Sequence, residues 1–584
     1  MPQRVLELIA AQVRRRPHAP ALVAPDGRLD YAELDRRSAA LAARLRQQGV
    51  RAGDAVLVQA SRSVALGVAV LGVLRAGGAF CVVDPDYPAD RAALMWRRSH
   101  ARFALVAAEV RPPVVPDGPV LLPLEADPAP VAAPTGVPDP DGEDPAYLVF
   151  TSGSTGVPKA ISLPHRCLDN LIAWTLAATS AEPLRTLMFA SLGFDVFVQE
   201  VFTAWCSGGC LYAPSEAERV DLQRVWSLCR EWGIERVFLP PVALRRLADL
   251  AAEFGVLPGT LREVAVAGEA LHITPAVREL FGRLPAARLH NHYGPSETHV
   301  AVAHTLTGPP HSWPDLPPIG RPLPGVTAHV APGEEGDELW LAGVALAHGY
   351  VRDPEQTARR FRPLRVGGRT VRAYRTGDLV RQRPDGVLEY LGRADGQLKI
   401  RGYRVEPGDV EAALLRHPGV RECAVVGWTP PDGEERRLVA HVVPAPGHRP
   451  SAEELRAHAA GLLPAYLVPQ HVLLAPELPL SPNGKIDRRR LPAPHAASCD
   501  TAQHPDPATG DVRAAVAAVW STVLGVTDVP PDRHFMELGG TSLSAALVVT
   551  RLHRHLRVEV SVQEFLRAPT VDALTALITE RTAA

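Results

Sequence analysis

The sequence predicts a layered α/β protein, followed by a smaller α/β unit and a bundle of helices at the C-terminus. Three observations favour this fold class. Helical and strand-like segments alternate through most of the 584 residues, as they do in layered α/β folds. A glycine-containing break at 392–396 interrupts the alternation, and residues 511–584 carry only amphipathic helical patterns. A chain of this length has room for roughly four compact units.

The beginning of the chain shows the alternation most clearly. Residues 30–50 have apolar side chains at helical spacing, residues 54–60 form a short β-like run, and residues 65–85 predict a helix, a glycine turn and a strand. Residues 111–145 are rich in Pro, Ala, Gly and Asp, so we expect a surface loop there. The alternation resumes at Ala146 and continues to the glycine-containing break.

The chain beyond the break divides by composition. Residues 397–492 alternate strand and helix patterns again and predict the smaller α/β unit. Residues 493–510 have the composition of a linker. The residues after the linker predict three or four amphipathic helices, and no solenoid repeat is visible along the chain.

The composition restricts the classes of function. The 62 basic and 64 acidic residues give a formal net charge of −2, which does not point to nucleic acid. Apolar residues make up 46% of the chain and charged residues 22%, as is typical of a globular protein. The sequence has no apolar run of about 18 residues and no signal-peptide pattern. We therefore expect a cytoplasmic protein without a membrane span.

The cysteines and lysines are informative because they are few. Seven cysteines are spread thinly, with neither zinc-ligand spacing nor a disulfide framework, which is typical of a reducing compartment. Cys206 and Cys210 are expected to pack as small apolar side chains. Only three of the 62 basic residues are lysine, namely Lys159, Lys399 and Lys485. Because Lys and Arg are not interchangeable in a tight polar site, each lysine is a candidate functional residue.

The strongest local signal runs from Ala146 to Lys159, where an apolar strand enters a turn rich in glycine and hydroxyl groups. Glycines let the backbone approach an anion closely, successive N–H groups form an anion-binding nest, and a lysine adds a point charge. No Walker pattern is present. By itself the segment fits a phosphate loop and a flexible turn equally well. The candidate ATP-binding residues here are Thr151, Ser152, Gly153, Ser154, Thr155, Gly156 and Lys159.

This segment resembles the phosphate-binding loop of the adenylate-forming superfamily, which includes acyl-CoA synthetases, luciferases and the adenylation domains of nonribosomal peptide synthetases. Further motifs of that superfamily follow in the expected order over nearly the whole chain, which favours the phosphate loop over the flexible turn. The matching segments are Leu74–Phe80, Asp84 with Pro85, Asn291–Glu297, Tyr374–Asp378, Gly392–Gly402, Leu463–Tyr466 and Asn483–Lys485.

The resemblance implies a nucleotide site. Asp378 would accept hydrogen bonds from the ribose hydroxyls, and Arg393 would lie near the nucleotide. Tyr293 would stack against adenine, within the motif that also supplies Asn291 and Gly294 as ATP-binding residues.

The resemblance also implies a metal ligand and two half-reactions. Glu297 would bind Mg²⁺, which prefers carboxylate oxygen. Lys485 would bridge the substrate carboxylate and the α-phosphate during adenylation. The segment around Lys399 would face the site during thioester formation. Asp395 would be the hinge about which a small subdomain rotates between the two steps.

Two features indicate the amino-acid-activating branch. In Phe194–Glu200, Asp195 occupies the position that pairs with the α-ammonium group of an amino acid. Residues 532–543 resemble the attachment motif of peptidyl carrier domains, in which Ser542 would carry 4′-phosphopantetheine. The implied architecture is an adenylation domain with a large N-terminal core and a small mobile α+β C-terminal subdomain, followed by an all-α four-helix carrier domain. The implied boundaries are 1–394 and 395–492 for the two parts of the adenylation domain, 493–510 for the linker and 511–584 for the carrier.

The family's specificity positions correspond to ten residues of this sequence. Asp195 and Lys485 would hold the ammonium and carboxylate groups of the substrate, and the other positions, which form the wall of the pocket, have no ionised side chain. The combination resembles that of L-proline-activating domains. A close proline analogue or another small apolar amino acid is the alternative, because one methylene changes discrimination by only about 1–3 kcal/mol. The ten positions are Asp195, Val196, Gln199, Phe238, Ala265, Ala267, His292, Val300, Ala301 and Lys485.

Three segments depart from the family pattern. Ala160 follows Lys159 where glycine is common, Gly343–Tyr350 lacks the usual glycine- and arginine-rich pattern, and the carrier motif has Thr541 before the serine. We assign the second segment no catalytic role. The first change adds one methyl group, and the third bears on partner choice rather than on the chemistry of the serine.

The predicted function is amino acid activation with ATP and Mg²⁺, followed by loading of the carrier, in nonribosomal peptide, antibiotic or related secondary-metabolite biosynthesis. The expected partners are a phosphopantetheinyl transferase and a condensation, ketosynthase or tailoring enzyme acting in trans, since no condensation or thioesterase domain is recognisable in the sequence. An MbtH-like helper is a further candidate. The alternatives are an acyl- or aryl-CoA ligase and an inactive scaffold that presents a carrier domain.

Overall fold

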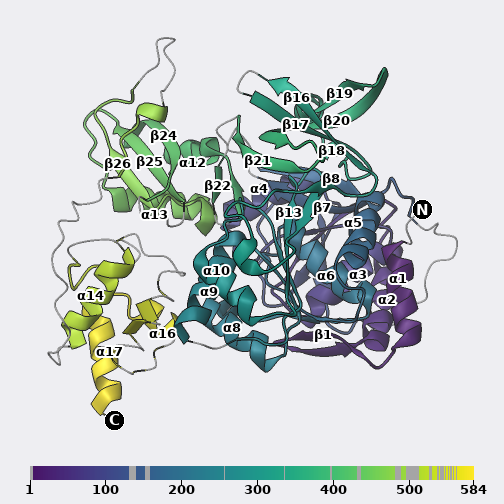
Figure 1. Ribbon diagram of the computed structural model, residues 1–584, viewed down its shortest axis with the longest axis horizontal. Coiled ribbons are helices and arrows are strands. Elements are labelled where there is room, and N and C mark those ends of the chain that lie inside the picture. Colours follow the sequence, from purple (N-terminus) through teal and green to yellow (C-terminus); the bar gives the residue numbers. More distant parts are fainter. Residues whose placement is uncertain are drawn as a thin grey trace. The chain divides into compact units, whose positions relative to one another are not determined.

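A computed structural model describes most of the chain (Figure 1). The described residues are 4–129, 140–151, 158–254, 257–333, 336–394, 398–400, 402–430, 436–479, 488–494, 512–524, 529–535, 538, 545, 548, 549, 551, 552, 556, 558, 560 and 562–583. Some of the predicted site residues lie outside this part of the chain. They are Ser152, Gly153, Ser154, Thr155, Gly156, Asp395, Lys485 and Ser542.

The chain forms two units, and the first contains the layered α/β fold that the sequence predicts. This unit comprises residues 1–215, 228–412 and 461–467. Its largest sheet has the strand order β15-β14-β13-β12-β11-β9-β10-β1-β2, and the strands from β13 to β1 are parallel. The strands are β1 (Pro20–Ala24), β2 (Gly27–Asp30), β9 (Arg185–Leu187), β10 (Cys210–Tyr212), β11 (Arg236–Leu239), β12 (Glu263–Val266), β13 (Arg288–Tyr293), β14 (Val302–Thr305) and β15 (Arg321–Pro322).

A second sheet of the first unit has the order β18-β8-β7-β4-β3-β5-β6. Its strands are β3 (Ala55–Gln59), β4 (Ala79–Val82), β5 (Phe103–Ala107), β6 (Val120–Leu124), β7 (Pro145–Thr151), β8 (Lys159–Pro164) and β18 (Gly349–Tyr350). The strand β6 corrects the prediction that 111–145 is only a loop. It is an edge strand with Val120 and Leu121 more than half exposed, and its apolar run contains Pro123, a residue that is confined to edge strands and bulges within sheets.

Helices fill the space between the two sheets. The helix α3 contacts strands of both sheets, and every residue from Val64 to Leu74 is buried, as expected for a helix that is apolar on all sides. The helix α2 begins after Asp30, whose side chain accepts a hydrogen bond from the backbone N–H of Glu33.

The helices of the first unit are α1 (Val5–Arg15), α2 (Tyr31–Gln47), α3 (Val64–Arg75), α4 (Ala89–Ser99), α5 (His165–Ala178), α6 (Asp195–Ser207), α9 (Pro241–Phe254), α10 (Pro275–Arg283), α11 (Pro354–Arg360), η1 (Pro310–Ser312) and η2 (Ala465–Leu467).

A third sheet and a short hairpin complete the first unit. The sheet has the order β16-β17-β20-β19, with β21 paired to β20, and the hairpin is β22-β23. The strands are β16 (Val326–Gly333), β17 (Gly336–Gly343), β19 (Phe361–Val366), β20 (Arg369–Gln382), β21 (Leu388–Arg393), β22 (Leu398–Ile400) and β23 (Tyr403–Val405). The hairpin groups with the large unit in this structure, and the boundary of the small subdomain at residue 395 stays a prediction.

The second unit contains the expected smaller α/β part, in which β24 (Val420–Trp428), β25 (Arg437–Pro444) and β26 (His471–Leu474) form one sheet. The helix α12 (Pro407–Leu414) runs from one unit into the other. The remaining helices by sequence are α7 (Glu216–Val220), α8 (Leu222–Glu231), α13 (Ala452–Leu462) and η3 (Arg488–Arg490). The boundary at residue 492 and the linker that follows it stay predictions.

The C-terminal residues have a hydrophobic core of their own. The described helices are α14 (Val512–Leu524), α16 (Val562–Arg567) and α17 (Val571–Ala583). The rings of Trp520, Phe535 and Phe565 pack together, with centroids 4.7–5.6 Å apart. This core agrees with the predicted helical bundle.

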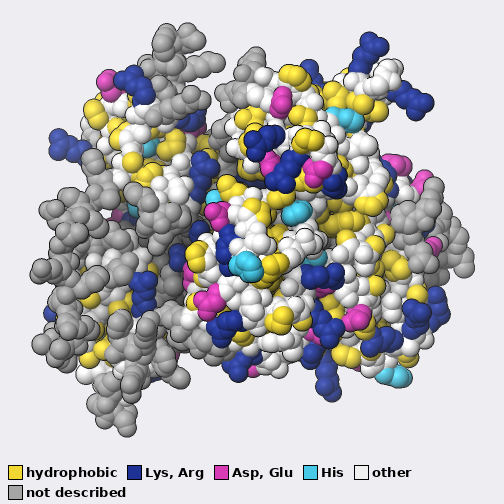
Figure 2. Space-filling view, in the orientation of Figure 1, with side chains coloured by type: hydrophobic (Ala, Val, Ile, Leu, Met, Phe, Trp, Pro, Cys, Tyr) yellow, Lys and Arg dark blue, Asp and Glu magenta, His cyan; other side chains and the backbone are white. Residues whose placement is uncertain are grey.

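Surface and cysteine patterns fit the composition. On the face shown in Figure 2, basic and acidic side chains are interspersed. Six cysteines of the described part of the chain, Cys206 and Cys210 among them, are buried and form no disulfide, as expected of small apolar side chains. No helix among the described residues has both the length and the apolar character to cross a bilayer.

The junction between α6 and β10 gives a test of this packing. A Cβ on Gly209 would lie 2.2 Å from the carbonyl oxygen of Leu184, a backbone atom that cannot rotate away. We expect Gly209→Ala to lower the free energy of unfolding of the first unit by about 1–3 kcal/mol, measured by urea unfolding. The matched control is Gly282→Ala in α10, where nothing lies within 4 Å of the new methyl group. Equal stability of the two variants would contradict the described packing.

Candidate functional site

The predicted ribose-binding residue Asp378 lies in a buried cluster where β13, β20 and β21 meet. Arg393 is its register partner across β20 and β21 and donates a 2.8 Å hydrogen bond to Oδ1 of Asp378. The hydroxyl of Tyr293 donates to Oδ2 of the same carboxylate. The structure therefore brings together three of the residues that the sequence assigned to the nucleotide.

Lys399 joins this cluster from the β22-β23 hairpin. Its ammonium nitrogen lies 5.7 Å from the ring centroid of Tyr293, a distance at which a cation is attracted to an aromatic ring. Burial lowers the pKa of Lys399, and the nearby Asp378 carboxylate opposes that shift. Burial together with Asp378 also holds the pKa of Tyr293 well above its usual value. Tyr293 is therefore a neutral hydrogen-bond donor at neutral pH.

Asn291 and Gly294 shape the same part of β13 and the turn after it. The side chain of Asn291 is buried and donates a 2.9 Å hydrogen bond to the carbonyl of Pro318. A Cβ on Gly294 would lie 1.5 Å from the carbonyl oxygen of His299, so only glycine fits there. Both residues therefore fix the backbone beside Tyr293. Their contact with ATP stays a prediction.

The predicted metal ligand Glu297 is fully buried and has two partners that the sequence analysis missed. One guanidinium nitrogen of Arg404 lies 3.1 Å from Oε1 and 2.9 Å from Oε2, and the hydroxyl of Tyr350 donates a 2.6 Å hydrogen bond to Oε1. Burial opposes ionisation of Glu297, but Arg404 and Tyr350 hold its pKa below the usual value. The two partners lie far from Glu297 in the sequence. Tyr350 ends a segment to which we assigned no catalytic role, and Arg404 lies two residues beyond the Gly392–Gly402 motif.

Lys159 from the phosphate-loop segment lies beside this cluster. Because β18 pairs with β8, with Tyr350 opposite Ile161, the Lys159 ammonium lies 5.5 Å from the ring centroid of Tyr350. Ala160, the departure from the family pattern, is buried in the apolar core. Thr151 is buried at the end of β7 and pairs with Lys159. The strand ends therefore direct both flanks of the predicted loop toward Glu297.

A single carboxylate fits a Mg²⁺ site of the expected kind. Among the described residues, no group of three or more His, Cys, Asp or Glu side chains could hold a metal. Mg²⁺ usually keeps several waters and is bound through one or two carboxylates together with substrate phosphates. Glu297, which has the ammonium group of Lys159 nearby, suits that chemistry.

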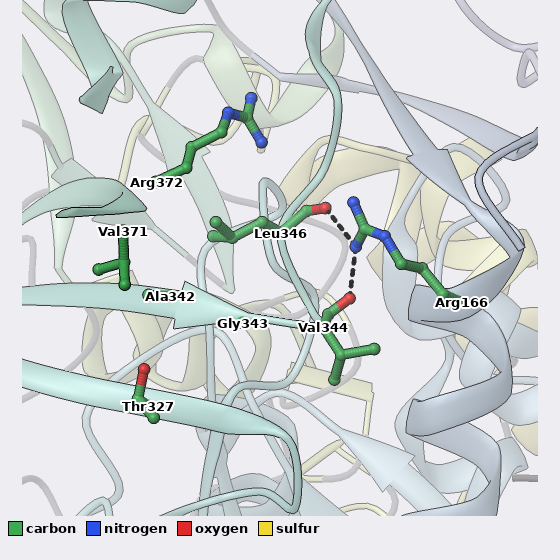
Figure 3. A pocket seen from close by; sticks show the side chains of 8 residues that line it. All are labelled: Arg166, Thr327, Ala342, Gly343, Val344, Leu346, Val371 and Arg372. Atoms are coloured by element: carbon green, nitrogen blue, oxygen red, sulfur yellow. Dashed lines mark hydrogen bonds between the residues drawn. The ribbon is translucent and has the colours of Figure 1, made fainter. Parts of the chain in front are cut away.

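The segment Gly343–Tyr350 is fastened by two arginines at the edge of a cavity of about 600 Å³ (Figure 3). Arg166 donates hydrogen bonds to the carbonyls of Val344 and Leu346, and Arg372 donates to the next two carbonyls, at 2.9 and 2.6 Å. The segment thus has a positioning role, because it leads directly to Tyr350.

The predicted amino acid pocket is assembled from α6 and from strands β11 to β13. Asp195 is the first residue of α6 and Gln199 lies one turn later. Phe238 and Ala265 are register partners across β11 and β12. Among the other wall residues, His292, Val300 and Ala301 are buried, and Val196 and Ala267 are half-buried.

Four further side chains support the pocket and were missed by the sequence analysis. Trp174 contacts the edge of His292, with ring centroids 5.1 Å apart. Gln199 donates a 3.0 Å hydrogen bond to the hydroxyl of Thr175. His299 lies 2.8 Å from the Tyr147 hydroxyl through Nδ1. These residues match none of the motifs of the family, and they are recognised only by their contacts in the folded structure.

The histidines in this region are neutral. Burial lowers the pKa of His292 well below its usual value, and burial also lowers the pKa of His299 although Asp195 opposes the shift. In the described structure the Nε2 atoms of both rings lack a hydrogen-bond partner. The wall of the pocket therefore contains uncharged groups next to the single carboxylate of Asp195.

The predicted closing motif Leu463–Tyr466 also lies in the first unit. Tyr466 stacks on Tyr403 of the hairpin, with ring centroids 4.0 Å apart, and Phe194 packs edge-on against Tyr403. The hydroxyl of Tyr403 lies 2.6 Å from that of Ser191. The hairpin is thus connected to the residue directly before Asp195.

The comparisons with known proteins agree with this fold, and the chain belongs to the AMP-binding enzyme family. The family description matches residues 9–351, its C-terminal domain matches residues 409–485, and a phosphopantetheine attachment site matches residues 514–578. This is the domain order of a nonribosomal peptide synthetase adenylation–carrier didomain. ATP and Mg²⁺ are the usual cofactors of such a domain, and 4′-phosphopantetheine is that of the carrier.

Individual relatives match the chain over almost its whole length. The chain is 38% identical to phosphinothricin tripeptide synthetase PhsC of Streptomyces viridochromogenes over 96% of its length, and 35% identical to tyrocidine synthase 2 of Brevibacillus parabrevis over 98%. It spans 52% and 16% of those two proteins. The solved structure of holo-PA1221, described as a synthetase protein with adenylation and PCP domains bound to a vinylsulfonamide inhibitor, is 27% identical. Its TM-score is 0.80, and the match covers 100% of this chain and 99% of that one.

The Asp378 cluster gives a test of the nucleotide site. Asp378→Asn removes the charge that holds Arg393 and that would accept the ribose hydroxyls. Because hydrogen bonds to charged groups contribute roughly 1.5–3 kcal/mol, we expect ATP to bind about 10- to 100-fold more weakly, measured by isothermal titration calorimetry. The control is Asp385→Asn, an exposed aspartate between the same two strands. Wild-type ATP affinity in the Asp378 variant would remove this cluster from the nucleotide site.

Proposed function

We propose that the chain activates L-proline as prolyl-AMP with Mg-ATP and loads it as a thioester on a phosphopantetheine arm at Ser542. The product would be used in nonribosomal peptide or related secondary-metabolite biosynthesis. The observation that carries the proposal is the set of side chains at the predicted substrate positions, because the described residues around Asp195 are apolar or neutral. Such a pocket suits a compact apolar amino acid with a charged amine.

The placement of Asp195 supports recognition of the substrate ammonium group. A carboxylate in the first turn of a helix is stabilised by the helix dipole, and Asp195 is the first residue of α6. A cationic amine would pair with it, whereas a neutral tail would leave the carboxylate without a counter-charge. This disfavours an acyl- or aryl-CoA ligase.

The walls support proline over larger or charged substrates. Phe238, Val300 and the alanines of β12 and of the β13–β14 connection supply apolar surface, and an acidic or basic substrate side chain would be buried without a partner. Gln199 is held by Thr175 and His292 by Trp174, so the polar wall groups are fixed in place. A close analogue such as pipecolate or methylproline is the alternative substrate.

The residues would act in a defined order during adenylation. Asp195 would hold the amine while Lys485 neutralises the substrate carboxylate and the α-phosphate as the carboxylate oxygen attacks phosphorus and pyrophosphate leaves. Lys159 and the loop before it would hold the phosphates, and Asp378 would hold the ribose. Mg²⁺ at Glu297 would supply positive charge to the phosphates.

The second step would use the arrangement around Lys399. A phosphopantetheine arm on Ser542 would supply the thiol that accepts the prolyl group, and AMP would leave. Lys399 lies beside Tyr293 and Asp378, where its charge would stabilise the departing nucleotide. A hinge at Asp395 would allow the exchange of Lys485 and Lys399 at the site.

The proposal includes the partners and the location of the protein. A phosphopantetheinyl transferase would modify Ser542, and a condensation, ketosynthase or tailoring enzyme would take the loaded prolyl group. An MbtH-like protein is a candidate helper, and the cytoplasm is the expected compartment. An inactive scaffold is disfavoured, because the charged cluster of Asp378, Arg393 and Lys399 is intact.

The test is amino-acid-dependent ATP–pyrophosphate exchange over a panel of amino and aryl acids, with and without an MbtH-like protein. We expect the strongest exchange with L-proline and a loss of roughly 100-fold or more in Asp195→Ala, because a buried charge would lose its partner. The matched control is Asp90→Ala, an exposed acidic residue in the first turn of α4, which should retain exchange.

The outcomes separate the levels of the proposal. Exchange with another acid alone would overturn the assignment to proline and keep the adenylating chemistry. Exchange with aryl acids that survives Asp195→Ala would favour the CoA ligase. Absence of ATP–pyrophosphate exchange with every acid would favour the inactive scaffold that presents a carrier domain.

A further inference from the structure

The Glu297 carboxylate already has a positively charged partner. It is fully buried, and both of its oxygens lie within 3.1 Å of a single guanidinium nitrogen of Arg404. The Tyr350 hydroxyl donates a further hydrogen bond to Oε1. The oxygens that would bind Mg²⁺ are therefore those that Arg404 contacts.

Arg404 is carried by a part of the chain that follows the predicted hinge. It lies on β23 of the β22-β23 hairpin. This hairpin contacts the rest of the first unit at several other points. The Gly402 backbone donates a 2.9 Å hydrogen bond to Glu269, Tyr403 stacks on Tyr466, and Lys399 lies over Tyr293. Insertion of Arg404 therefore accompanies docking of the whole hairpin.

The approach of the hairpin is close enough to depend on glycine. Gly268 has φ +98°, and a Cβ there would lie 2.9 Å from the carbonyl oxygen of Gly402. Gly402 itself has φ +80°, and its Cβ would lie 2.9 Å from Pro240. Side chains longer than glycine at either position would keep Arg404 away from Glu297.

Electrostatics allow only one of the two cations at a time. A buried carboxylate needs a counter-charge, and either Mg²⁺ or a guanidinium group can provide it. Both together would place a divalent ion against Arg404, with Lys159 and Arg360 as further cations and Glu406 as a second carboxylate nearby. The repulsion between them in a buried site would be large.

We propose that Arg404 is an internal substitute for Mg²⁺ at Glu297, so that hairpin docking and metal binding exclude each other. The inference rests on the proposed function, because it uses a metal-dependent first step. When the metal leaves with pyrophosphate, Arg404 takes its place, and the hairpin brings Lys399 to Tyr293 and Asp378. Arg404 is thus a positioning residue that orders the two half-reactions.

Linkage gives the proposal a measurable form. If docking weakens metal binding by a given factor, metal binding must weaken docking by the same factor. Removal of the guanidinium group should therefore tighten metal binding and loosen the hairpin together. A purely structural role for Arg404 would loosen the hairpin without tightening metal binding.

The first experiment measures Mn²⁺ binding to the full chain by electron paramagnetic resonance, in the presence of α,β-methylene-ATP. We expect Arg404→Met to bind Mn²⁺ about tenfold or more tightly than wild type, and Arg404→Lys to lie between them. The matched control is Arg381→Met, which breaks an exposed arginine–glutamate pair in the same unit and should bind Mn²⁺ as wild type does. Equal Mn²⁺ affinity in Arg404→Met and wild type would overturn the proposal.

The second experiment needs no variant. Hydrogen–deuterium exchange of the peptides covering residues 398–405 is compared in wild type with α,β-methylene-ATP plus EDTA and with the same nucleotide plus Mg²⁺. We expect Mg²⁺ to increase the exchange of this hairpin several-fold. Unchanged or slower exchange on addition of Mg²⁺ would overturn the proposal even if the substituted chains do not fold.

Failure of this inference is distinguishable from failure of the proposed function. Both readouts use nucleotide and metal without an amino acid, so they do not depend on the identity of the substrate. Pyrophosphate exchange with proline but no effect of Arg404 on Mn²⁺ affinity rejects only the cation substitution. Absence of exchange with every acid rejects the proposed function by itself.

Discussion

The buried carboxylate of Glu297 is the constraint on which the candidate site depends. A carboxylate without solvent contact is stable only with a cation and with hydrogen bonds to its oxygens. Tyr350 of β18 and Arg404 of β23 meet this requirement, and each comes from a different part of the chain. The ion pair therefore fixes the hairpin and the Gly343–Tyr350 segment relative to the turn after β13.

The parallel strands of the largest sheet explain why the other groups gather nearby. In open α/β sheets, ligands bind outside the carboxyl ends of the strands. Phe238 lies near the end of β11, Ala265 near the end of β12, and His292 and Tyr293 at the end of β13. The helix α6 adds Asp195 at its N-terminus. The residues predicted to line the substrate and those predicted to bind the nucleotide thus lie near the carboxyl ends of these strands.

Much of this arrangement could be predicted from the sequence, because motifs record contacts that depend on residue type. Tyr293, Asp378 and Arg393 were assigned together and are in contact. Arg404 and Tyr350 were not assigned, since an ion pair between residues 107 positions apart leaves no periodic or local pattern. The edge strand β6 was missed because its short apolar run contains Pro123 and lies in a segment rich in Pro, Ala, Gly and Asp. The grouping of the β22-β23 hairpin with the large unit depends on the same long-range contacts.

The scarcity of lysine acquires a physical meaning in this arrangement. Arginine replaces lysine almost everywhere in the chain, yet the two described lysines both lie near a buried carboxylate and an aromatic ring, Lys159 at Tyr350 and Lys399 at Tyr293. Each site already contains an arginine, Arg404 or Arg393, whose planar group fills the contact with the carboxylate. A second arginine would need space for a planar guanidinium group with five N–H donors. The ammonium group of a lysine is more compact, and its flexible side chain can turn toward a phosphate. Each described lysine therefore lies where an arginine contacts one buried carboxylate and the lysine is a second cation nearby.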